Sequence, residues 1–402
     1  MTIRKLNGVI QNYAWGSRTM LAQFQGRSAP TQAPEAELWF GAHALAPSAI
    51  EVEGARYKLD DYIRNHPVEQ LGADVSGQFG KLPFLLKVLA VDQPLSIQVH
   101  PSLEQAQAGF RRERSLGIDS SDARANYRDD WSKPELLCPL TEFRALCGFR
   151  PIDELIALFG ALGGECFKRA EAVLRSSPDE MAMLQVVGNW MRSTGKDKDA
   201  LFGSAIEACS AARMQSRLES HDTALILELA ERYPGDIGVL VALVLRQLTL
   251  SPGMGLFVPP GVLHAYLSGF AIEVMASSDN VLRGGLTPKR VDIDELLNLT
   301  NFRSNPPTLV QLERRSPIEQ HFVTETPYFR VSCVDIGGSA TFCANHRTGP
   351  EMLLCAKGSL CLVGSREANL PLATGECAWI SADEDVYCLS GEGQGYRVQV
   401  GP

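Results

Sequence analysis

The sequence predicts a mainly β protein in which two jelly-roll-like β-domains flank an inserted α-helical domain. Three observations lead to this expectation. The 402 residues include 35 Gly and 23 Pro, a content typical of chains with many turns between short strands. Apolar residues follow strand-like runs in both end regions and helical spacing between about 151 and 239. A chain of this length is also too long for one ordinary core, so two or three domains are expected.

The first hundred residues are expected to form short strands separated by turns. The segments with strand character are GVIQNYAWGS, AELWFGAHALAPS, SAIEVEG and LPFLLKVLAVDQPLSIQVHP. In the last of these, Ser96, Gln98 and His100 alternate with apolar residues. Alternate residues of a strand point to the same side, so these three polar side chains are expected to share one face.

The middle of the chain changes period. Residues 102–130 are charged and polar and are expected to form a helix followed by a loop, whereas 131–150 return to strand character. Helical spacing then appears in PIDELIALFGALGG, SPDEMAMLQVVGNWMRS, ALFGSAIEACSAARMQSRLES and DTALILELAERYP. Pro or Asp opens several of these segments and Gly or Pro closes them, as is typical of helix ends.

The last part returns to strands, in GMGLFVPPGVLHAYLSGFAIEVMAS and in short Gly-punctuated runs after about 311. The expected domains are a catalytic jelly roll from 1–100, 131–150 and 240–310, a helical insertion at 151–239, and a C-terminal β-domain at 311–402. All the candidate site residues named below precede 290. We therefore expect removal of the C-terminal domain to reduce stability before it affects chemistry.

Composition limits the possible partners. The formal net charge is −9 and no stripe of Lys and Arg is visible, so nucleic acid is not an expected partner. The ten Cys include no CxxC pair, and we expect them to be reduced and mostly buried, as in cytoplasmic proteins. The first residues lack the apolar stretch of a secretory signal, and the longest apolar run, 237–245, is too short to span a membrane. A cytoplasmic monomer without a membrane partner is expected.

A metal site is one interpretation of the scattered histidines. In FVPPGVLHAYL, a Pro-Pro-Gly turn delivers His264 to the following strand. His100, His264, a carboxylate and Gln98 as a weak amide ligand would form a catalytic site with one position open. Glu135 in SKPELL is the carboxylate candidate, but it is one of 47 acidic residues. On pattern alone, structural histidines and a solvated Glu135 remain the alternative.

A basic loop is the third informative segment. In EVMASSDNVLRGGLTPK, Arg283 precedes a Gly-Gly pair and Lys289 follows a Thr-Pro turn. Gly allows a close approach of the backbone to a ligand, and Arg and Lys bind phosphate as a planar fork and as a point charge. A surface turn with two solvated cations is the alternative. The residue pattern itself therefore indicates only a β-rich metal-binding candidate with a basic loop.

Taken together, these segments resemble the type I phosphomannose isomerases (mannose-6-phosphate isomerases). The resemblance covers residues 11–289 in the family's order. The part after 311 fits the family's C-terminal β-domain only by its general pattern of short strands and Gly turns. The segments that carry it are QNYAWGS, AELWFGAH, LPFLLKVLAVDQPLSIQVHP, KPELL, YPGDIGVLVALVL, PPGVLHAYLSG and EVMASSDNVLRGGLTPK.

The resemblance implies a cupin-type zinc enzyme with one Zn²⁺ per chain. Its implied reaction is the aldose–ketose interconversion of D-mannose 6-phosphate and D-fructose 6-phosphate through a cis-enediolate, in mannose metabolism and the supply of GDP-mannose precursors. The implied metal ligands are Gln98, His100, Glu135 and His264. The implied phosphate-binding residues are Ser96, Lys87 and Lys289. The implied catalytic residues are Arg283, Glu273, Lys133, Asp279 and His43.

One position departs from the family pattern. The family usually has Asn-His before Lys-Pro-Glu, whereas this chain has Trp131 and Ser132. A histidine that is sometimes given a catalytic part is therefore absent. Three alternatives stay open: an iron-dependent cupin dioxygenase, a sugar-phosphate sensor without turnover, and an isomerase for another pair of sugars such as glucose 6-phosphate.

Overall fold

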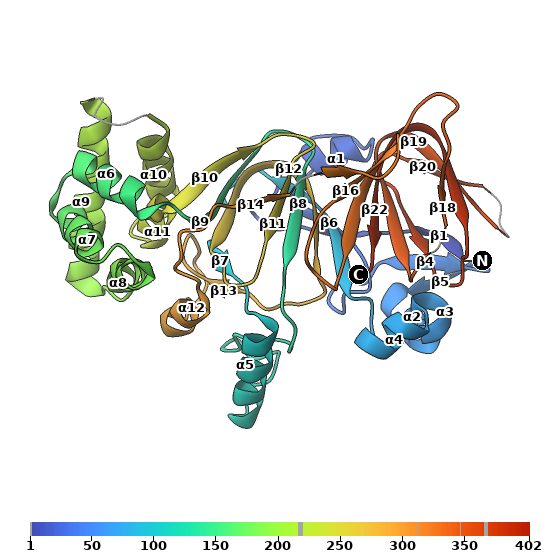
Figure 1. The fold of residues 1–402 in the computed structure, drawn as a ribbon, viewed down its shortest axis with the longest axis horizontal. Helices are drawn as coiled ribbons and strands as arrows, with labels where there is room; N and C mark the ends of the chain where they lie inside the picture. The colour runs from blue at the N-terminus through green and yellow to red at the C-terminus, as the bar shows by residue number, and fades with distance from the viewer. Residues whose placement is uncertain (1, 216–219, 311, 346, 366–368) are drawn as a thin grey trace.

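The computed structural model describes residues 2–215, 220–310, 312–345, 347–365 and 369–402. In this part helix and strand occupy nearly equal shares, so strand does not dominate as the composition predicts. The strands form two large antiparallel sheets and one small hairpin, β4 (Ala49–Val52) with β5 (Ala55–Lys58). The two large sheets lie side by side, and a group of helices lies at the far end of the first (Figure 1).

The larger sheet has eleven strands: β2 (Val9–Gln11), β3 (Glu37–Phe40), β6 (Phe84–Val91), β7 (Gln98–Val99), β8 (Glu135–Pro139), β9 (Phe143–Phe149), β10 (Leu245–Leu250), β11 (Gly255–Val258), β12 (His264–Ala276), β13 (Leu282–Arg283) and β14 (Thr308–Val310). Its main path is β14-β11-β8-β12-β6-β3-β2, while β7 and β9 also pair with β12. β12 is the central strand of this path, and its side chains are therefore buried at all but one of thirteen positions. Its later part pairs with β6 and its start lies beside β7.

The segment around Gln98 is shorter as a strand than expected. Only Gln98 and Val99 form ladder pairs. The N–H groups of Leu95 and Ile97 instead donate to the carbonyls of Tyr266 and Gly285, and Pro101, which has no N–H, follows the segment. The alternation itself is present. Ile97 and Val99 are fully buried in the core, whereas Ser96 and Gln98 line a cavity on the other side.

The smaller sheet has nine strands: β1 (Ile3–Leu6), β15 (Leu312–Arg314), β16 (Glu319–Phe322), β17 (Arg330–Ile336), β18 (Phe342–Ala344), β19 (Glu351–Gly364), β20 (Leu370–Ala373), β21 (Cys377–Ile380) and β22 (Tyr387–Gln399). All but the first come from the end of the chain. β1 pairs with β21 in antiparallel register, so the N-terminal strand joins the C-terminal sheet (Figure 1).

The helices are α1 (Met20–Phe24), α2 (Leu59–Asn65), α3 (Pro67–Leu71), α4 (Ala73–Phe79), α5 (Leu103–Ser115), α6 (Ile152–Leu162), α7 (Glu165–Ser176), α8 (Glu180–Met191), α9 (Gly195–Met214), α10 (Ser220–Arg232), α11 (Gly238–Val244) and α12 (Ile293–Leu299). The six from α6 to α11 follow one another between β9 and β10. The expectation of strands throughout the first hundred residues was wrong for 20–24, which form α1, and for 59–79, which form α2–α4. Leu59 and Ile63 repeat at helical spacing there, and Pro67 occupies the first turn of α3, where its missing N–H does no harm.

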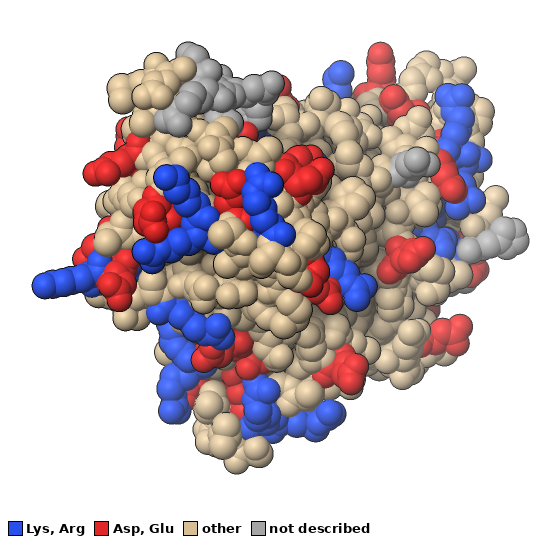
Figure 2. All heavy atoms as spheres, turned by 60° about the vertical axis from the view of Figure 1, so that its left-hand side comes forward, with Lys and Arg blue, Asp and Glu red and all other residues tan. Residues whose placement is uncertain are grey.

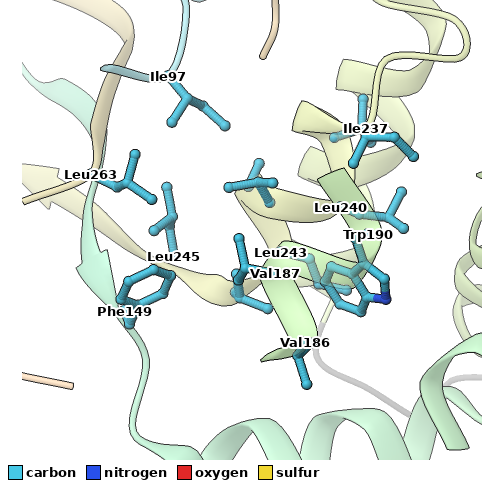
Figure 3. Close-up of a cluster of buried hydrophobic side chains, with 14 of the residues drawn as sticks. Ile97, Phe149, Val186, Val187, Trp190, Ile237, Leu240, Leu243, Leu245 and Leu263 are labelled. Atoms are coloured by element: carbon cyan, nitrogen blue, oxygen red, sulfur yellow. The ribbon is translucent and has the colours of Figure 1, made fainter. Parts of the chain in front are cut away.

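The helices reach the candidate site through a continuous apolar cluster. Trp190 of α8 and Leu240 of α11 pack in the same cluster as Leu263, just before β12, and Ile97, just before β7 (Figure 3). These four side chains are at most 5% exposed. The helical segment thus supports the back of the segment that carries Gln98 and His100.

A second apolar cluster joins the two sheets. It contains Val88 and Ile272 of the larger sheet together with Met352 and Trp379 of the smaller one, all fully buried. The two sheets therefore share one core along their common side.

The cysteines depart from expectation at one pair. Cys343 and Cys388 are directly opposite each other on β18 and β22 and form a disulfide. The prediction that every cysteine is reduced was therefore wrong for this pair, because spacing alone did not reveal the cross-strand register. The other eight are free, and six of them are buried.

The surface has interspersed charges. On the face shown in Figure 2, Lys and Arg lie among Asp and Glu, without the continuous basic surface that nucleic-acid binding uses. Among the described helices, none is both long enough and apolar enough to cross a bilayer.

Candidate metal centre and active site

Two imidazoles and one carboxylate meet at one point of the larger sheet. His100 follows β7, Glu135 begins β8 and His264 begins β12, and all three side chains are buried. His100 Nε2 lies 3.1 Å from Glu135 Oε1, and His264 Nε2 lies 3.3 Å from Glu135 Oε2. Within the described residues, this is the group of His, Cys, Asp and Glu whose ligand atoms all lie within 4.8 Å of one another.

The hydrogen bonds of the two rings assign their tautomers. His100 Nδ1 lies 2.7 Å from the carbonyl oxygen of Asn280, and His264 Nδ1 lies 3.0 Å from that of Val262. A carbonyl only accepts, so each Nδ1 carries the proton and each Nε2 directs a lone pair at the carboxylate. Lone pairs that face an anion require a cation between them. Ligand atoms of a tetrahedral zinc site are separated by about 3.3 Å, so the donor set fits this metal.

Burial and neighbouring charges give His100 and Glu135 the protonation states that metal binding requires. Burial, with the nearby Lys133 cation, lowers the pKa of His100 to about 4, so the ring is neutral at pH 7. Burial opposes the ionisation of Glu135, but Lys133 and His100 outweigh it and hold the pKa of Glu135 well below its usual range. A neutral imidazole and an ionised carboxylate are the ligand forms of these residues.

Gln98 lies next to this group through strand register. It is the cross-strand partner of His264 on one side and of Arg283 on the other, and directly opposite residues share a face of the sheet. Gln98 Nε2 donates to Ser96 Oγ over 3.3 Å, which leaves the amide oxygen available as an acceptor. The predicted amide ligand and the predicted arginine are therefore neighbours of a predicted imidazole ligand.

A small cavity of about 50 Å³ lies beside the metal ligands. Its lining includes seven of the twelve predicted site residues, with five others: Lys87, Ser96, Gln98, Lys133, Glu135, His264 and Glu273, and Glu37, Leu89, Leu95, Ala265 and Tyr266. The structure thus brings most of the predicted site together. His43, His100, Asp279, Arg283 and Lys289 do not line this cavity.

Lys87 is a buried cation with two carboxylate partners. It lies opposite Glu273 in the sheet, and its Nζ is 3.2 Å from Glu273 Oε2 and 3.7 Å from Glu37 Oε2. Burial alone would lower the pKa of Lys87, but Glu37 and Glu273 raise it above its usual value. Its predicted phosphate contact would require exchange of one carboxylate, and this role stays a prediction.

Two further groups in the cavity are suited to proton chemistry. Lys133 Nζ lies 3.0 Å from Glu135 Oε1, since residues two apart on an extended segment share a face. Burial, and then the charge of Glu135, raises the pKa of Glu273 above that of an ordinary glutamate. A carboxyl with a raised pKa is better matched to acid–base work near pH 7.

Three cations lie near one another beyond Gln98. Burial, and then Arg128, lowers the pKa of Arg283. The pKa of Lys289 is lowered by the charge of Arg283, then by burial and by Arg128. In the described part of the chain, neither Arg283 nor Lys289 lies within ion-pair distance of a carboxylate. Such an uncompensated group of cations is complementary to a phosphate.

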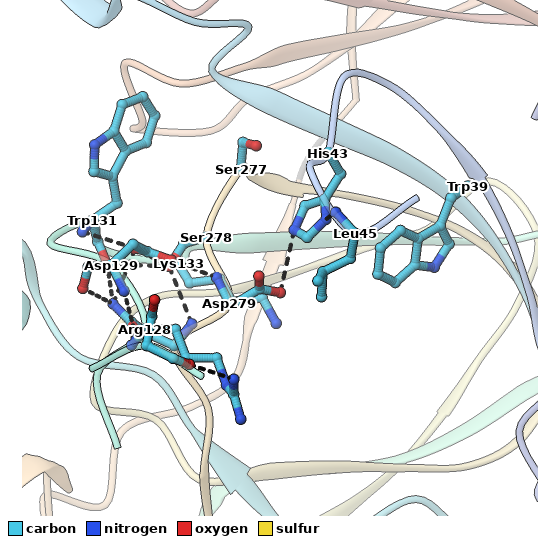
Figure 4. A network of polar contacts seen from close by, with 12 residues as sticks. Trp39, His43, Leu45, Arg128, Asp129, Trp131, Lys133, Ser277, Ser278 and Asp279 are labelled. Atoms are coloured by element: carbon cyan, nitrogen blue, oxygen red, sulfur yellow. Dashed lines mark hydrogen bonds and ion pairs between the residues drawn. The ribbon is translucent and has the colours of Figure 1, made fainter. Parts of the chain in front are cut away.

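His43 and Asp279 form a pair at the edge of the site (Figure 4). His43 Nε2 lies 3.2 Å from Asp279 Oδ1, and the His43 ring packs edge-on against Trp39. Burial would raise the pKa of Asp279, but His43 and Lys133 lower it below its usual value. Asp279 is therefore ionised at neutral pH and orients the imidazole.

The departure from the family pattern has a structural role here. Ser132 Oγ lies 3.0 Å from the hydroxyl of Tyr328, which precedes β17, and both side chains are buried. Trp131 stacks on the Tyr328 ring, with centroids 5.4 Å apart. The Lys81 ammonium lies 3.9 Å above the Trp131 ring. Trp131 and Ser132 thus contact the segment that leads into β17 and do not line the cavity.

Of the five cavity residues that were not predicted, two have polar side chains, Tyr266 and Glu37. Tyr266 lies two residues after His264, so strand alternation places it on the same face and could have identified it; its hydroxyl is 3.5 Å from Glu135 Oε2. Glu37 accepts a hydrogen bond from Trp39 Nε1 and lies near Lys87. Its place in the site follows from the pairing of β3 with β6, which no local pattern reveals.

Comparison with known proteins agrees with this geometry. The family model for the phosphomannose isomerase type I catalytic domain matches residues 3–152. Mannose-6-phosphate isomerase of Salmonella typhimurium is 37% identical over 398 residues, covering 98% of this chain and 99% of the relative. That of Mus musculus is 32% identical, covering 95% and 94%. A solved zinc-bound mannose 6-phosphate isomerase matches with a TM-score of 0.91 at 35% identity, covering 100% of both chains. The chain belongs to the type I phosphomannose isomerase family of enzymes.

Proposed function

We propose that this chain interconverts D-mannose 6-phosphate and D-fructose 6-phosphate with one zinc ion per chain. The observation that carries the proposal is the buried group of His100, Glu135 and His264, whose two imidazole lone pairs and carboxylate oxygens meet at one point. These residues would hold the zinc, with the amide oxygen of Gln98 as a weak further ligand. When bound, zinc acts as a Lewis acid that stabilises negative charge developing on the substrate oxygens.

We also propose that both large sheets are cupin-type jelly rolls, with 151–239 as a helical domain inserted into the first. Antiparallel pairing in both sheets and the unbroken series of helices between β9 and β10 support this division. On this basis, 1–100, 131–150 and 240–310 form the catalytic domain and 311–402 the second β-domain, whose sheet also takes in β1 from the start of the chain.

Proton transfer between C2 and C1, through a cis-enediolate, needs a base inside the cavity. Glu273 and Lys133 both line it, and the raised pKa of Glu273 favours that carboxyl. In this assignment, Lys133 contributes positive charge where the enediolate forms. We expect kcat to fall at acid pH in the parent chain as Glu273 becomes protonated. Glu273→Gln should remove this dependence on pH, and Lys133→Gln should retain it.

The remaining residues bind and orient the substrate. Arg283 and Lys289, which have no carboxylate partner among the described residues, hold the phosphate, with Ser96 as a hydroxyl donor. The charge of Arg283 also stabilises the enediolate. The binding energy of these phosphate contacts, which lie away from the reacting carbons C1 and C2, holds the sugar in a reactive geometry. His43, held by Asp279, exchanges the ring-opening proton.

The test is an assay of fructose 6-phosphate formation from mannose 6-phosphate, before chelation, after chelation and after zinc is added back. We expect turnover that chelation abolishes and zinc restores, with none from glucose 6-phosphate and no oxygen consumption. Absence of turnover by a chain that binds both zinc and the sugar phosphate would contradict the proposal. That outcome would favour a sugar-phosphate sensor without turnover. The presence of Ser132 where the family usually has a histidine would then explain the lost activity.

The proposal extends to the pathway, the compartment and the oligomeric state. Mannose 6-phosphate formed by this enzyme would supply precursors of GDP-mannose, and we expect a cytoplasmic monomer. Light scattering at the elution peak of a sizing column tests the monomer directly.

A further inference from the structure

We infer that Asn280 is a positioning residue that sets the zinc affinity of this chain by joining the segments that carry two metal ligands. The inference rests on the proposed function for the presence of zinc. Asn280 lies in the loop between β12 and β13, is completely buried and does not line the cavity. It makes hydrogen bonds in two directions, one with its backbone and the other with its side chain.

The backbone of Asn280 acts on a metal ligand. Its carbonyl oxygen accepts the proton of His100 Nδ1 over 2.7 Å. This bond fixes both the tautomer and the plane of the ring, so Nε2 keeps its lone pair toward Glu135. The position of the carbonyl depends on the loop that carries it.

The side chain of Asn280 holds that loop against a second segment. Its Oδ1 accepts from the backbone N–H of Arg128 over 2.8 Å and of Asp129 over 3.2 Å. Its Nδ2 donates to the carbonyls of Asp129 and Trp131, both over 2.9 Å. The amide thus uses two acceptor and two donor positions, which is its full capacity.

This pattern is specific to asparagine. Aspartate has the same shape but no donor, so its second oxygen would face two carbonyl oxygens. Alanine would leave two backbone N–H groups and two carbonyls, all part-buried, without these partners, and each such group has a cost.

The segment held by Asn280 leads directly to the site. Trp131, whose carbonyl is fixed, stands two residues before Lys133 and four before Glu135. One side chain therefore connects the loop that orients His100 with the segment that presents Glu135. Figure 4 shows the neighbouring contacts that tie the two segments together.

The Asp129 side chain forms further hydrogen bonds between the same two segments, the loop that carries Asn280 and the segment that leads to Glu135. Its Oδ1 accepts from Ser278 Oγ over 2.8 Å, and its Oδ2 accepts from the backbone N–H of Asp279 over 2.7 Å. These bonds join the same two segments without contact with the metal ligands.

The experiment compares Asn280→Asp and Asn280→Ala with the parent chain by titrating zinc against a chromophoric chelator, without substrate. We expect the zinc dissociation constant to rise about tenfold to hundredfold, as when outer partners of metal ligands are removed elsewhere. At saturating zinc, kcat should fall while KM for mannose 6-phosphate stays unchanged. The matched control is Leu229→Ala, a buried substitution in α10 that should lower thermal stability and leave zinc affinity unchanged.

A folded Asn280→Asp chain with unchanged zinc affinity would overturn the inference. If neither variant folds, Asp129→Asn tests the link from the other segment, and unchanged zinc affinity there overturns it equally. Zinc binding is measured directly, so a chain without isomerase activity would contradict the proposed function and leave this result readable.

Discussion

At the scale of single residues, each imidazole of the metal site has a backbone carbonyl on one side and Glu135 on the other. The carbonyls fix the rings, and the charge of Glu135 is the one anionic contribution among the assigned ligands. Glu135 and Arg283 should therefore have separable effects, one on the metal and the other on turnover.

Glu135→Ala should lose zinc. Two neutral imidazoles and a weak amide would remain, and removal of the carboxylate takes away the only negative ligand. We expect elemental analysis after dialysis to find less than one zinc per chain and the assay to find no turnover. The control Glu142→Ala changes an exposed residue after β8 and should keep both the bound zinc and the turnover. A metal-free Glu135→Ala chain with normal activity would refute the ligand assignment.

Arg283→Ala should keep zinc and lose turnover. Arg283 lies opposite Gln98 but is not an expected ligand, and its charge serves the phosphate and the developing enediolate. We expect kcat to fall by about 10²–10³, the usual effect of removing a donor at a reacting centre. Arg303→Ala, an exposed arginine paired with Glu180, is the control. Loss of zinc in Arg283→Ala would assign the residue a structural role instead.

At the scale of elements, the smaller sheet contains a buried ionic network that is separate from the active site. Glu351 at the start of β19 accepts from Arg397 Nε over 2.6 Å, Arg347 Nε over 2.9 Å and the Tyr387 hydroxyl over 2.8 Å. Burial would raise the pKa of Glu351, but the two guanidinium groups outweigh it and lower the pKa. The stability of this sheet should therefore depend on pH.

The sign follows from the direction of the shift. The pKa of Glu351 is lower in the folded chain than in the unfolded chain, so the unfolded state binds more protons in acid. Its contribution is complete above the unfolded pKa and is lost as pH falls through the folded pKa. Glu351→Gln should lower the free energy of unfolding at pH 7 by about 3–5 kcal/mol, because both arginines stay buried without this carboxylate and Arg397 keeps just the longer contact to Glu319, over 3.3 Å.

Urea unfolding at pH 7 and at acid pH checks this prediction. The difference between Glu351→Gln and the parent chain should shrink as the pH falls. Glu392→Gln, an exposed residue of β22, should behave as the parent at both values. A difference that is constant with pH would show that the loss comes from packing and not from charge.

The sequence predicted those parts of the elements that depend on local spacing. Alternation along 96–100 placed Ser96 and Gln98 on the cavity side, and helical spacing marked the segments that become α6 and α8 to α10, whereas the segment of α7 was not marked. Features that depend on pairing between distant strands were not predictable: Glu37 enters the site through the register of β3, and Cys343 meets Cys388 through that of β18. The helices α2–α4 were missed because short amphipathic turns resemble short strands in composition.

At the scale of the whole molecule, the two sheets depend on each other. The apolar cluster that includes Val88, Ile272, Met352 and Trp379 belongs to both. A fragment of residues 1–310 would expose its half of this core to water and would leave β1 without β21. We expect this fragment not to fold, as measured by circular dichroism and by zinc binding. A soluble, folded 1–310 fragment would contradict the shared core, and one that had also lost its metal would contradict the division into domains.

The position of β1 has a consequence for how the molecule is made. Ribosomes add about 5–20 residues per second, so Ile3–Leu6 emerge long before the residues 377–380 with which they pair. Throughout that interval, this strand has no neighbour from the sheet it will join. We therefore expect the second sheet, and the core it shares with the first, to close only after residues 377–380 have been synthesised. A strand that is made early thus reaches its place late.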